Sequence, residues 1–220
     1  MLGQAEYRRL SAVLEPFDLV QGEALHAPGE SVTHFYFPED AVVSLLFDVD
    51  RRRRVEVAME GNEGAVGVAA YLGGVSSPNL CVVRDAGHAM RLEARVLTEV
   101  VSERDRLPGL LRRYVHALVV QVAQSGICNR FHNIDARLAR WLLMTHDRVG
   151  SPELLATQES IAQMLGVRRS SVTAAAVDLH RRNLISYARG RIEIRDTAAL
   201  RLAACPCYSI IRREYDAFLD

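Results

Sequence analysis

Short apolar runs alternate with turn-forming segments over the first hundred residues. The runs are rich in β-branched, aromatic and aliphatic side chains, and Gly, Pro and Asp stand between them. Regularly spaced runs of this kind are typical of an all-β barrel or roll. We predict strands at residues 19–20, 34–37, 41–49, 55–59, 80–83 and 88–92. The charged run Arg51–Arg54 is expected to be a hairpin turn exposed to solvent, with a binding patch as the alternative.

A helical pattern begins at about residue 99 and, after Pro108, continues to about Asn129. Positions within it follow an alternating spacing of four and three residues, which predicts a seam that faces a partner helix. The seam consists of Leu111, Val115, Leu118, Val122, Ser125 and Asn129. A second copy of the chain would complete it as a two-fold dimer. Burial of the same helix within a monomer is the alternative.

The segment 131–135 interrupts that helix. Asp135 is expected to cap a second amphipathic helix, since its side chain can accept a hydrogen bond from the first turn. We therefore predict a domain boundary, and a hinge, at this interruption.

A helix-turn-helix pattern follows. Thr157 is expected to cap a helix that starts at Gln158, and Gly166 stands where a tight turn requires a positive φ. The second helix is predicted at about residues 169–181, and two short strands around a glycine turn follow at 184–194. Apolar side chains at four positions form the expected core between the two helices, namely Ile161, Leu165, Val167 and Val172. The whole segment is typical of a winged helix-turn-helix.

The second helix of such a motif enters the major groove of DNA with its N-terminal end. Residues 157–195 carry seven arginines against three acidic residues, a balance of +4 that suits a phosphate backbone. The residues predicted to contact DNA are Thr157, Gln158, Arg168, Arg169, Ser170, Ser171, Thr173, Arg189 and Arg191.

Charge is distributed unevenly, although the formal net charge is zero. Residues 1–100 hold nine Arg against fifteen acids, and residues 101–220 hold eighteen Arg against twelve, which indicates two units with different partners. No apolar run has the length of a membrane span, and residues 1–10 do not have the pattern of a secretory signal. These features favour a cytoplasmic protein.

Four cysteines do not form a disulfide framework in a chain of this length. Cys205 and Cys207 form a CxC pair with no second pair and no nearby histidine in sequence, so we assign no metal site, and their redox or metal role stays open. We also assign no catalytic residue. The glycine-rich segment 61–67 has neither Walker nor dinucleotide spacing, so an enzyme is not expected.

Taken together, these motifs resemble the Crp/Fnr family of transcription regulators over almost the whole chain. The winged motif at 157–194 is the most specific part, and the segments 25–30 and 61–67 are similar to the family's cyclic-nucleotide-binding β-roll. The resemblance implies an α+β protein with a jelly-roll-like effector domain at 1–105, a dimerisation helix at 106–132 and a winged helix-turn-helix DNA-binding domain at 133–220. It implies a homodimer on a two-fold-related operator.

The effector pocket departs from the family pattern. Family members that bind cyclic nucleotides carry a Gly-Glu pair for the ribose and, about ten residues later, an Arg for the phosphate. The matching positions here are Gly67-Val68 and Ser77-Pro78, and no Arg lies between residues 54 and 84. The degenerate pocket thus comprises Gly67, Val68, Ser77 and, from the long helix, Gln124. We do not expect cyclic AMP to bind in the usual manner.

The small-molecule effector and any cofactor remain unidentified from the sequence. The N-terminal cysteine cluster that family oxygen sensors use for an iron–sulfur centre is missing, and haem ligation by His26, His34 or His88 stays open. In the recognition helix, Arg169 is followed by Ser170, where the family's commonest guanine-reading pattern has Arg followed by Glu. The operator should therefore differ from the best-known family sequence.

The sequence thus predicts a dimeric, sequence-specific transcription regulator whose partner is double-stranded DNA. If it activates transcription, RNA polymerase is a further partner, and a single sequence does not reveal the contact surface. The alternative is a ligand-binding or protein-interaction module whose winged domain contacts another protein. A steep dependence of DNA affinity on salt would separate the two hypotheses.

Overall fold

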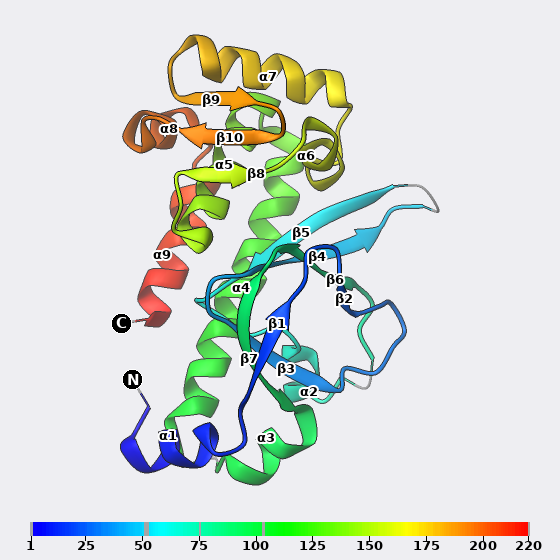
Figure 1. The fold of residues 1–220 in the computed structure, drawn as a ribbon, viewed down its shortest axis with the longest axis vertical. Helices are drawn as coiled ribbons and strands as arrows, with labels where there is room; N and C mark the ends of the chain where they lie inside the picture. The colour runs from blue at the N-terminus through cyan, green and yellow to red at the C-terminus, as the bar shows by residue number, and fades with distance from the viewer. Residues whose placement is uncertain (1, 51–52, 75, 103, 220) are drawn as a thin grey trace. The chain divides into compact units, whose positions relative to one another are not determined.

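The computed structural model describes residues 2–50, 53–74, 76–102 and 104–219 (Figure 1). The chain forms two compact units. The first comprises Met1–Leu45, Met59–Val119 and Glu214–Asp220, and the second comprises Leu46–Ala58 and Val120–Arg213. The long helix α4 (Arg106–Phe131) is thus shared between the units, which differs from the predicted division into three consecutive segments.

The first unit is built on two sheets, and the outer part of the β4–β5 hairpin, Leu46–Ala58, is grouped with the second unit. One sheet has the order β1-β7-β3 and the other the order β2-β6-β4-β5. Their strands are β1 (Glu15–Leu19), β2 (Ala24–His26), β3 (His34–Pro38), β4 (Val42–Asp48), β5 (Arg54–Glu60), β6 (Leu80–Asp85) and β7 (Gly87–Glu93). Three short helices accompany them, α1 (Gln4–Ser11), α2 (Val68–Tyr71) and α3 (Ala94–Val100). The predicted α+β class with an N-terminal β-roll is confirmed.

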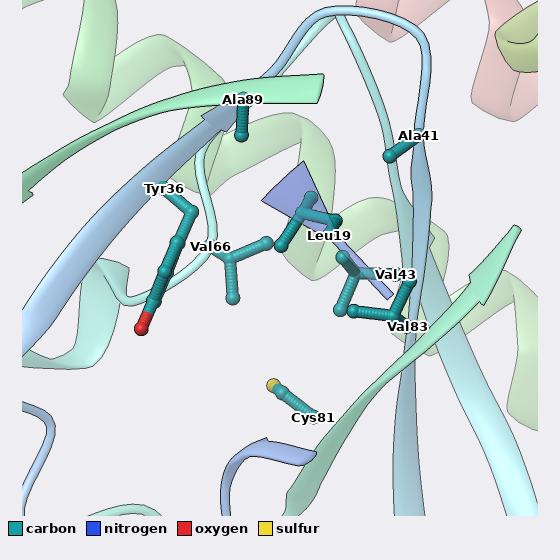
Figure 2. Close-up of a cluster of buried hydrophobic side chains, with 8 residues drawn as sticks. All are labelled: Leu19, Tyr36, Ala41, Val43, Val66, Cys81, Val83 and Ala89. Atoms are coloured by element: carbon teal, nitrogen blue, oxygen red, sulfur yellow. The ribbon is translucent and has the colours of Figure 1, made fainter. Parts of the chain in front are cut away.

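A cluster of small and branched side chains forms the core of this unit (Figure 2). Its members come from strands of both sheets, from the residue before β4 and from the loop before α2, so they hold the two sheets together. They are Leu19, Tyr36, Ala41, Val43, Val66, Cys81, Val83 and Ala89.

Five of the six predicted strands coincide with observed strands, and the sixth marks only the end of β1. Most of β1 is exposed, and β2 is only three residues long with an irregular register, so neither produces an apolar run. Arg51 and Arg52 of the predicted turn lie outside the described residues. Beside them, Arg53 pairs with Asp50 at 2.7 Å in the exposed, solvated turn that we predicted.

Helix α4 begins at Arg106 and includes Pro108 in its first turn, where the missing N–H needs no partner within the helix. Helix α5 (Ile134–Val149) follows it. The predicted cap at Asp135 is wrong: Asn133 is the N-cap, and its side chain accepts a hydrogen bond from the Ala136 N–H at 3.0 Å. Asparagine and aspartate cap about equally well, and Asp135 lies in the first turn, where its charge favours the helix dipole.

The second unit carries the predicted winged motif. The motif contains α6 (Gln158–Leu165), α7 (Arg169–Arg181), β9 (Ile185–Ala188) and β10 (Arg191–Ile194), followed by α8 (Thr197–Ala203) and α9 (Cys207–Leu219). A strand that we did not predict, β8 (Glu153–Leu155), completes a three-stranded sheet in the order β8-β10-β9. Within the described part of the chain, no helix combines the length and apolar character needed to cross a membrane.

Candidate nucleic-acid interface

Local signals fix the geometry of the two helices of the motif. The Thr157 side chain accepts a hydrogen bond from the Ser160 N–H at 3.1 Å, so it caps α6 as predicted. Gly166 ends α6 with a φ of 63°, the left-handed conformation that glycine adopts without a steric penalty. Helix α7 then begins at Arg169.

A small core makes this pair of helices a rigid platform. Ile161 and Leu165 of α6 are buried, as are Val172 and Leu179 of α7. Val167, the fourth predicted core residue, is only half-buried. Since the apolar sides of both helices are packed inward, the polar N-terminal turn of α7 remains at the surface.

Two arginines occupy that exposed turn. The side chains of Arg168 and Arg169 are exposed and, among the described residues, neither guanidinium has a hydrogen bond or an ion pair. Ser170 beside them is exposed as well, whereas Ser171 is half-buried. Arg168 is the N-cap residue, and its side chain makes no capping hydrogen bond. The N-terminal end of α7 thus combines two free cations with the positive end of a helix dipole, which suits an anionic partner.

Gln158 and Thr173, two of the residues predicted to contact DNA, are hydrogen-bonded to each other. The Thr173 hydroxyl lies 2.6 Å from Oε1 of Gln158, to which it donates, and is also within 3.1 Å of the Arg169 carbonyl oxygen. These side chains therefore connect α6 to α7 within the motif. Their contribution in this structure is to hold the angle between the two helices.

The wing presents one free arginine. Arg189 lies at the tip of the β9–β10 hairpin with a φ of 50°, followed by Gly190 with a φ of 80°. Its side chain is exposed and has no ion pair with any described residue. Arg191, in contrast, pairs with Glu153 of β8 at 3.4 Å, a contact that the sequence could not predict because β8 itself was missed.

Other arginines of the motif are also paired. Arg182 contacts Asp178 at 3.4 Å and Arg195 contacts Glu193 at 3.8 Å. Among the described residues of the motif, free guanidinium groups thus remain at Arg168, Arg169, Arg181 and Arg189. Two of these four, Arg168 and Arg169, lie together at the N-terminal end of α7.

The predicted dimer seam on α4 is partly buried within the protomer. Leu111, Leu118 and Ser125 are at most 8% exposed, so they have little surface left to bury against a second copy, and Val115 is half-buried. Val122 is 40% exposed, and a neighbouring apolar side chain that the seam did not include, Val119, is 60% exposed. The exposed apolar surface of α4 thus includes Val122 of the predicted row and Val119 beside it.

The predicted effector residues are packed against their own unit. Gly67 has a φ of 101°, and a Cβ there would lie 2.5 Å from the His34 carbonyl oxygen, so only glycine fits. Val68 is 9% exposed, and the Ser77 hydroxyl donates to Oδ1 of Asn79 at 2.6 Å. Gln124 belongs to the second unit and is half-exposed.

The three histidines considered for haem have local explanations. Nδ1 of His34 is 2.9 Å from the Thr33 hydroxyl, and Nδ1 of His88 is 3.1 Å from the Asp40 carboxylate. Burial lowers the pKa of His26, opposed by the nearby charge of Glu30. None of these surroundings points to an axial ligand.

Cys205 and Cys207 have two potential ligands beside them that their position in the sequence did not indicate. Cys128 and His132, more than seventy residues away in sequence, lie beside them in the second unit. The four potential ligand atoms are all within 4.8 Å of one another. Sequence spacing alone could not reveal this, because the two pairs are brought together only by the packing of α4 and α9.

Comparisons with known proteins agree with this geometry. Residues 136–203 match the Crp-like helix-turn-helix domain. The structure is similar to FixK2 of Bradyrhizobium japonicum (TM-score 0.75, 15% identity, covering 88% of this chain and 98% of that one). It is also similar to a CRP-family transcriptional regulator of Thermus thermophilus (TM-score 0.69, 22% identity, 86% and 96%). A protein of Eubacterium rectale that is assigned to the Crp/Fnr family of transcriptional regulators is similar as well (TM-score 0.70, 17% identity, covering 92% of this chain and 94% of that one). No curated protein sequence matches the chain.

At these identities the structural similarity establishes a shared fold. The chain has the fold of the Crp/Fnr transcription regulators. Its C-terminal part is a Crp-like helix-turn-helix domain, a DNA-binding module.

Proposed function

We propose that this protein is a homodimeric, sequence-specific transcription regulator that reads a two-fold-related DNA operator through the N-terminal turn of α7. The observation that carries the proposal is the pair of free arginines, Arg168 and Arg169, at the exposed end of a helix whose other side is buried. A guanidinium can donate two parallel hydrogen bonds to O6 and N7 of guanine. In this role the protein would act in the cytoplasm.

We assign the contact with DNA bases to Arg169 and contacts with the DNA backbone to other exposed residues of the motif. Arg169 and Ser170 lie in the first turn of α7, which enters the groove in this class of motif. Arg168 and the wing residue Arg189 are suited to phosphates, because both are exposed cations outside the helix itself. Thr157 and Ser171 assist from the two helix N-termini, whereas Arg191 would first have to leave Glu153.

Self-association follows from the exposed apolar stripe of α4. Val119 and Val122 are exposed and three residues apart, so they lie on the same side of the helix. A second copy that packs on this side would remove apolar surface from water and generate two DNA-binding domains related by a two-fold axis.

The effector is proposed to differ from cyclic AMP. Val68 is aliphatic, so it cannot accept a hydrogen bond from a ribose hydroxyl, and the Ser77 hydroxyl is already bonded to Asn79. The next arginine along the chain, Arg84, pairs with Asp85 at 2.8 Å. Saturating cyclic AMP should therefore leave DNA affinity unchanged.

Selection of randomised duplexes by the purified protein, followed by a salt titration on the selected sequence, tests the proposal. We expect an inverted repeat with half-sites about one helical turn apart and an affinity that falls steeply with salt. An isolated half-site would contradict the dimer. A shallow salt dependence would favour a protein partner for the winged domain instead.

Arg169→Ala tests the assigned contact. It should cost about 1–3 kcal/mol on the selected site and remove discrimination at one base-pair position. Arg182→Ala is the matched control, since Arg182 closes the opposite end of the same helix and is paired with Asp178. Equal losses in both variants, or an unchanged base preference in Arg169→Ala, would refute the assignment.

A further inference from the structure

Three cysteines and one histidine lie close together in the second unit. None of them belongs to α7. Cys128 lies in the last turn of α4 and His132 one turn later, with the His132 N–H bonded to the Cys128 carbonyl at 3.1 Å. Cys205 lies between α8 and α9, and Cys207 is the first residue of α9. Residues four apart on a helix lie on the same side. Cys205 and Cys207 lie beside this pair, in contact with Cys128 and His132 respectively.

The distances between these side chains fit one tetrahedral ion. Sγ of Cys128 is 3.4 Å from Sγ of Cys205, and Sγ of Cys207 is 3.5 Å from Nδ1 of His132. Zinc–sulfur and zinc–nitrogen bonds of about 2.3 and 2.0 Å place tetrahedral ligands roughly 3.5–3.8 Å apart. All four ligand atoms lie within 4.8 Å of one another, which is too compact for the spread thiolates of a four-iron cluster.

We propose that Cys128, His132, Cys205 and Cys207 form a structural zinc site. Three thiolates and one imidazole complete the coordination of Zn²⁺, with no position left for water, as in structural rather than catalytic zinc sites. Soft sulfur ligands in tetrahedral geometry select zinc over Mg²⁺, Ca²⁺ or Mn²⁺.

The surroundings are built for a negatively charged group. Zn²⁺ with three thiolates and a neutral imidazole carries one net negative charge, and the nearby Arg140 is buried at 6% exposure. No described residue accepts a hydrogen bond from its Nε. Nε of Arg137 on the same helix is in the same condition, and a negatively charged zinc–thiolate group beside Arg140 would stabilise its buried charge.

The site closes a loop that contains the whole winged motif. Cys128 and His132 precede residues 133–204, and the other two ligands follow them. The Cys205 N–H also donates to the Ala136 carbonyl at 3.4 Å, and Ala136 packs against the three cysteines. Bound zinc would thus fasten both ends of the DNA-binding domain and restrict its unfolded state. This role concerns stability and does not depend on what the domain binds.

Metal content of the full chain, purified under reducing conditions with zinc supplied and excess removed, is the direct test. Elemental analysis should find one zinc per chain. Cys207→Ser should lower this to well below one, whereas the matched control Cys81→Ser, a buried cysteine of the β-roll core, should retain it. No zinc in the wild-type protein, the same content in Cys207→Ser as in wild type, or iron or copper instead would overturn the proposal.

His132→Cys separates loss of a ligand from loss of the fold. It keeps four ligands, so it should still bind one metal ion. With Co²⁺ as the probe, its thiolate-to-cobalt charge-transfer absorption should exceed that of the wild-type protein by about one third, as four thiolates replace three. An unchanged absorption would exclude position 132 from the coordination sphere. A disulfide between Cys128 and Cys205 in place of metal binding would also overturn the site.

Chelation gives a readout in the domain itself. Trp141 is the only tryptophan of the chain, is 2% exposed and lies in the second unit, so its fluorescence reports unfolding there. Removal of zinc should lower the midpoint of the unfolding transition followed by Trp141 fluorescence in the wild-type protein and in Cys81→Ser. It should leave the midpoint of Cys207→Ser unchanged. Loss of DNA binding with full zinc content would instead count against the proposed function.

Discussion

Replacing Gly64 by alanine should destabilise the first unit, because the backbone at this position lies directly against a buried tyrosine ring. A Cβ on Gly64 would lie 2.5 Å from Cζ and 2.7 Å from Oη of Tyr114, closer than non-bonded carbon and oxygen atoms approach. Tyr114 is 1% exposed, so its ring lies inside the packed core.

The magnitude follows from two contributions. Extra atoms in a packed core typically cost about 1–3 kcal/mol, since side chains leave their preferred rotamers. The Tyr114 hydroxyl also donates to Oε1 of the buried Glu60 at 2.5 Å, and displacement of the ring weakens this hydrogen bond. A hydrogen bond to a charged group contributes about 1.5–3 kcal/mol. We expect a total loss of about 2–5 kcal/mol, a large part of a typical domain's stability.

Urea denaturation followed by far-UV circular dichroism measures this loss, while Trp141 fluorescence reports the second unit separately. Gly109→Ala is the control: it adds the same methyl group in α4, where no atom lies within 4 Å, and should stabilise the helix by about 0.5–1 kcal/mol. In Gly64→Ala combined with Tyr114→Leu, the cost should be smaller than the sum of the single losses. A change below about 0.5 kcal/mol in Gly64→Ala, no larger than an ordinary surface substitution, would refute the reasoning.

Two further predictions concern capping and ionisation. Thr157→Ala removes the acceptor for the Ser160 N–H and should destabilise the second unit by about 0.5–2 kcal/mol in the Trp141 fluorescence transition, whereas Thr157→Ser should be nearly neutral. The hydrogen bond to Asp40 raises the pKa of His88 above 6.5, and the His88 backbone N–H, followed by its ring, lowers that of Asp40 below 3.8. The stabilisation from His88 is complete below pH 6.5 and is lost as pH rises through its raised pKa, and that from Asp40 is lost as pH falls through its lowered pKa. Titration by NMR should show both shifts, and a raised His88 pKa that persists in Asp40→Asn would contradict this pairing.

The winged motif was predictable because its signals are local. A capping threonine, a glycine with positive φ and a short apolar repeat each act within a few residues, and Thr157, Gly166 and the bounds of α7 agree with the sequence. Strands β2 and β8 were missed for the opposite reason: each is three residues long and depends on hydrogen bonds to strands distant in sequence.

The seam on α4 shows where periodicity stops being informative. A repeat of four and three residues identifies the apolar side of a helix, and both a second copy and the chain's own packing can cover it. Here Leu111 and Leu118 are buried within one protomer, while Val119, which the repeat excluded, is exposed. Val122, which belongs to the repeat, is exposed as well, so the repeat alone does not decide which side of the helix is free for a second copy.

The cysteines illustrate the same limit for chemistry. Metal-ligand motifs are recognised from sequence when pairs recur at short range, and Cys205-Pro-Cys207 alone offers only half of a site. The other half consists of Cys128 and His132, whose separation of four residues is common on any helix. Neither half therefore predicts a ligand set by itself. The two pairs form one ligand set because residues 133–204 fold into a domain whose two ends meet. This is a property of tertiary structure. A zinc ion at that junction would act on the domain as a whole, since it joins the chain where the motif begins to the chain where it ends.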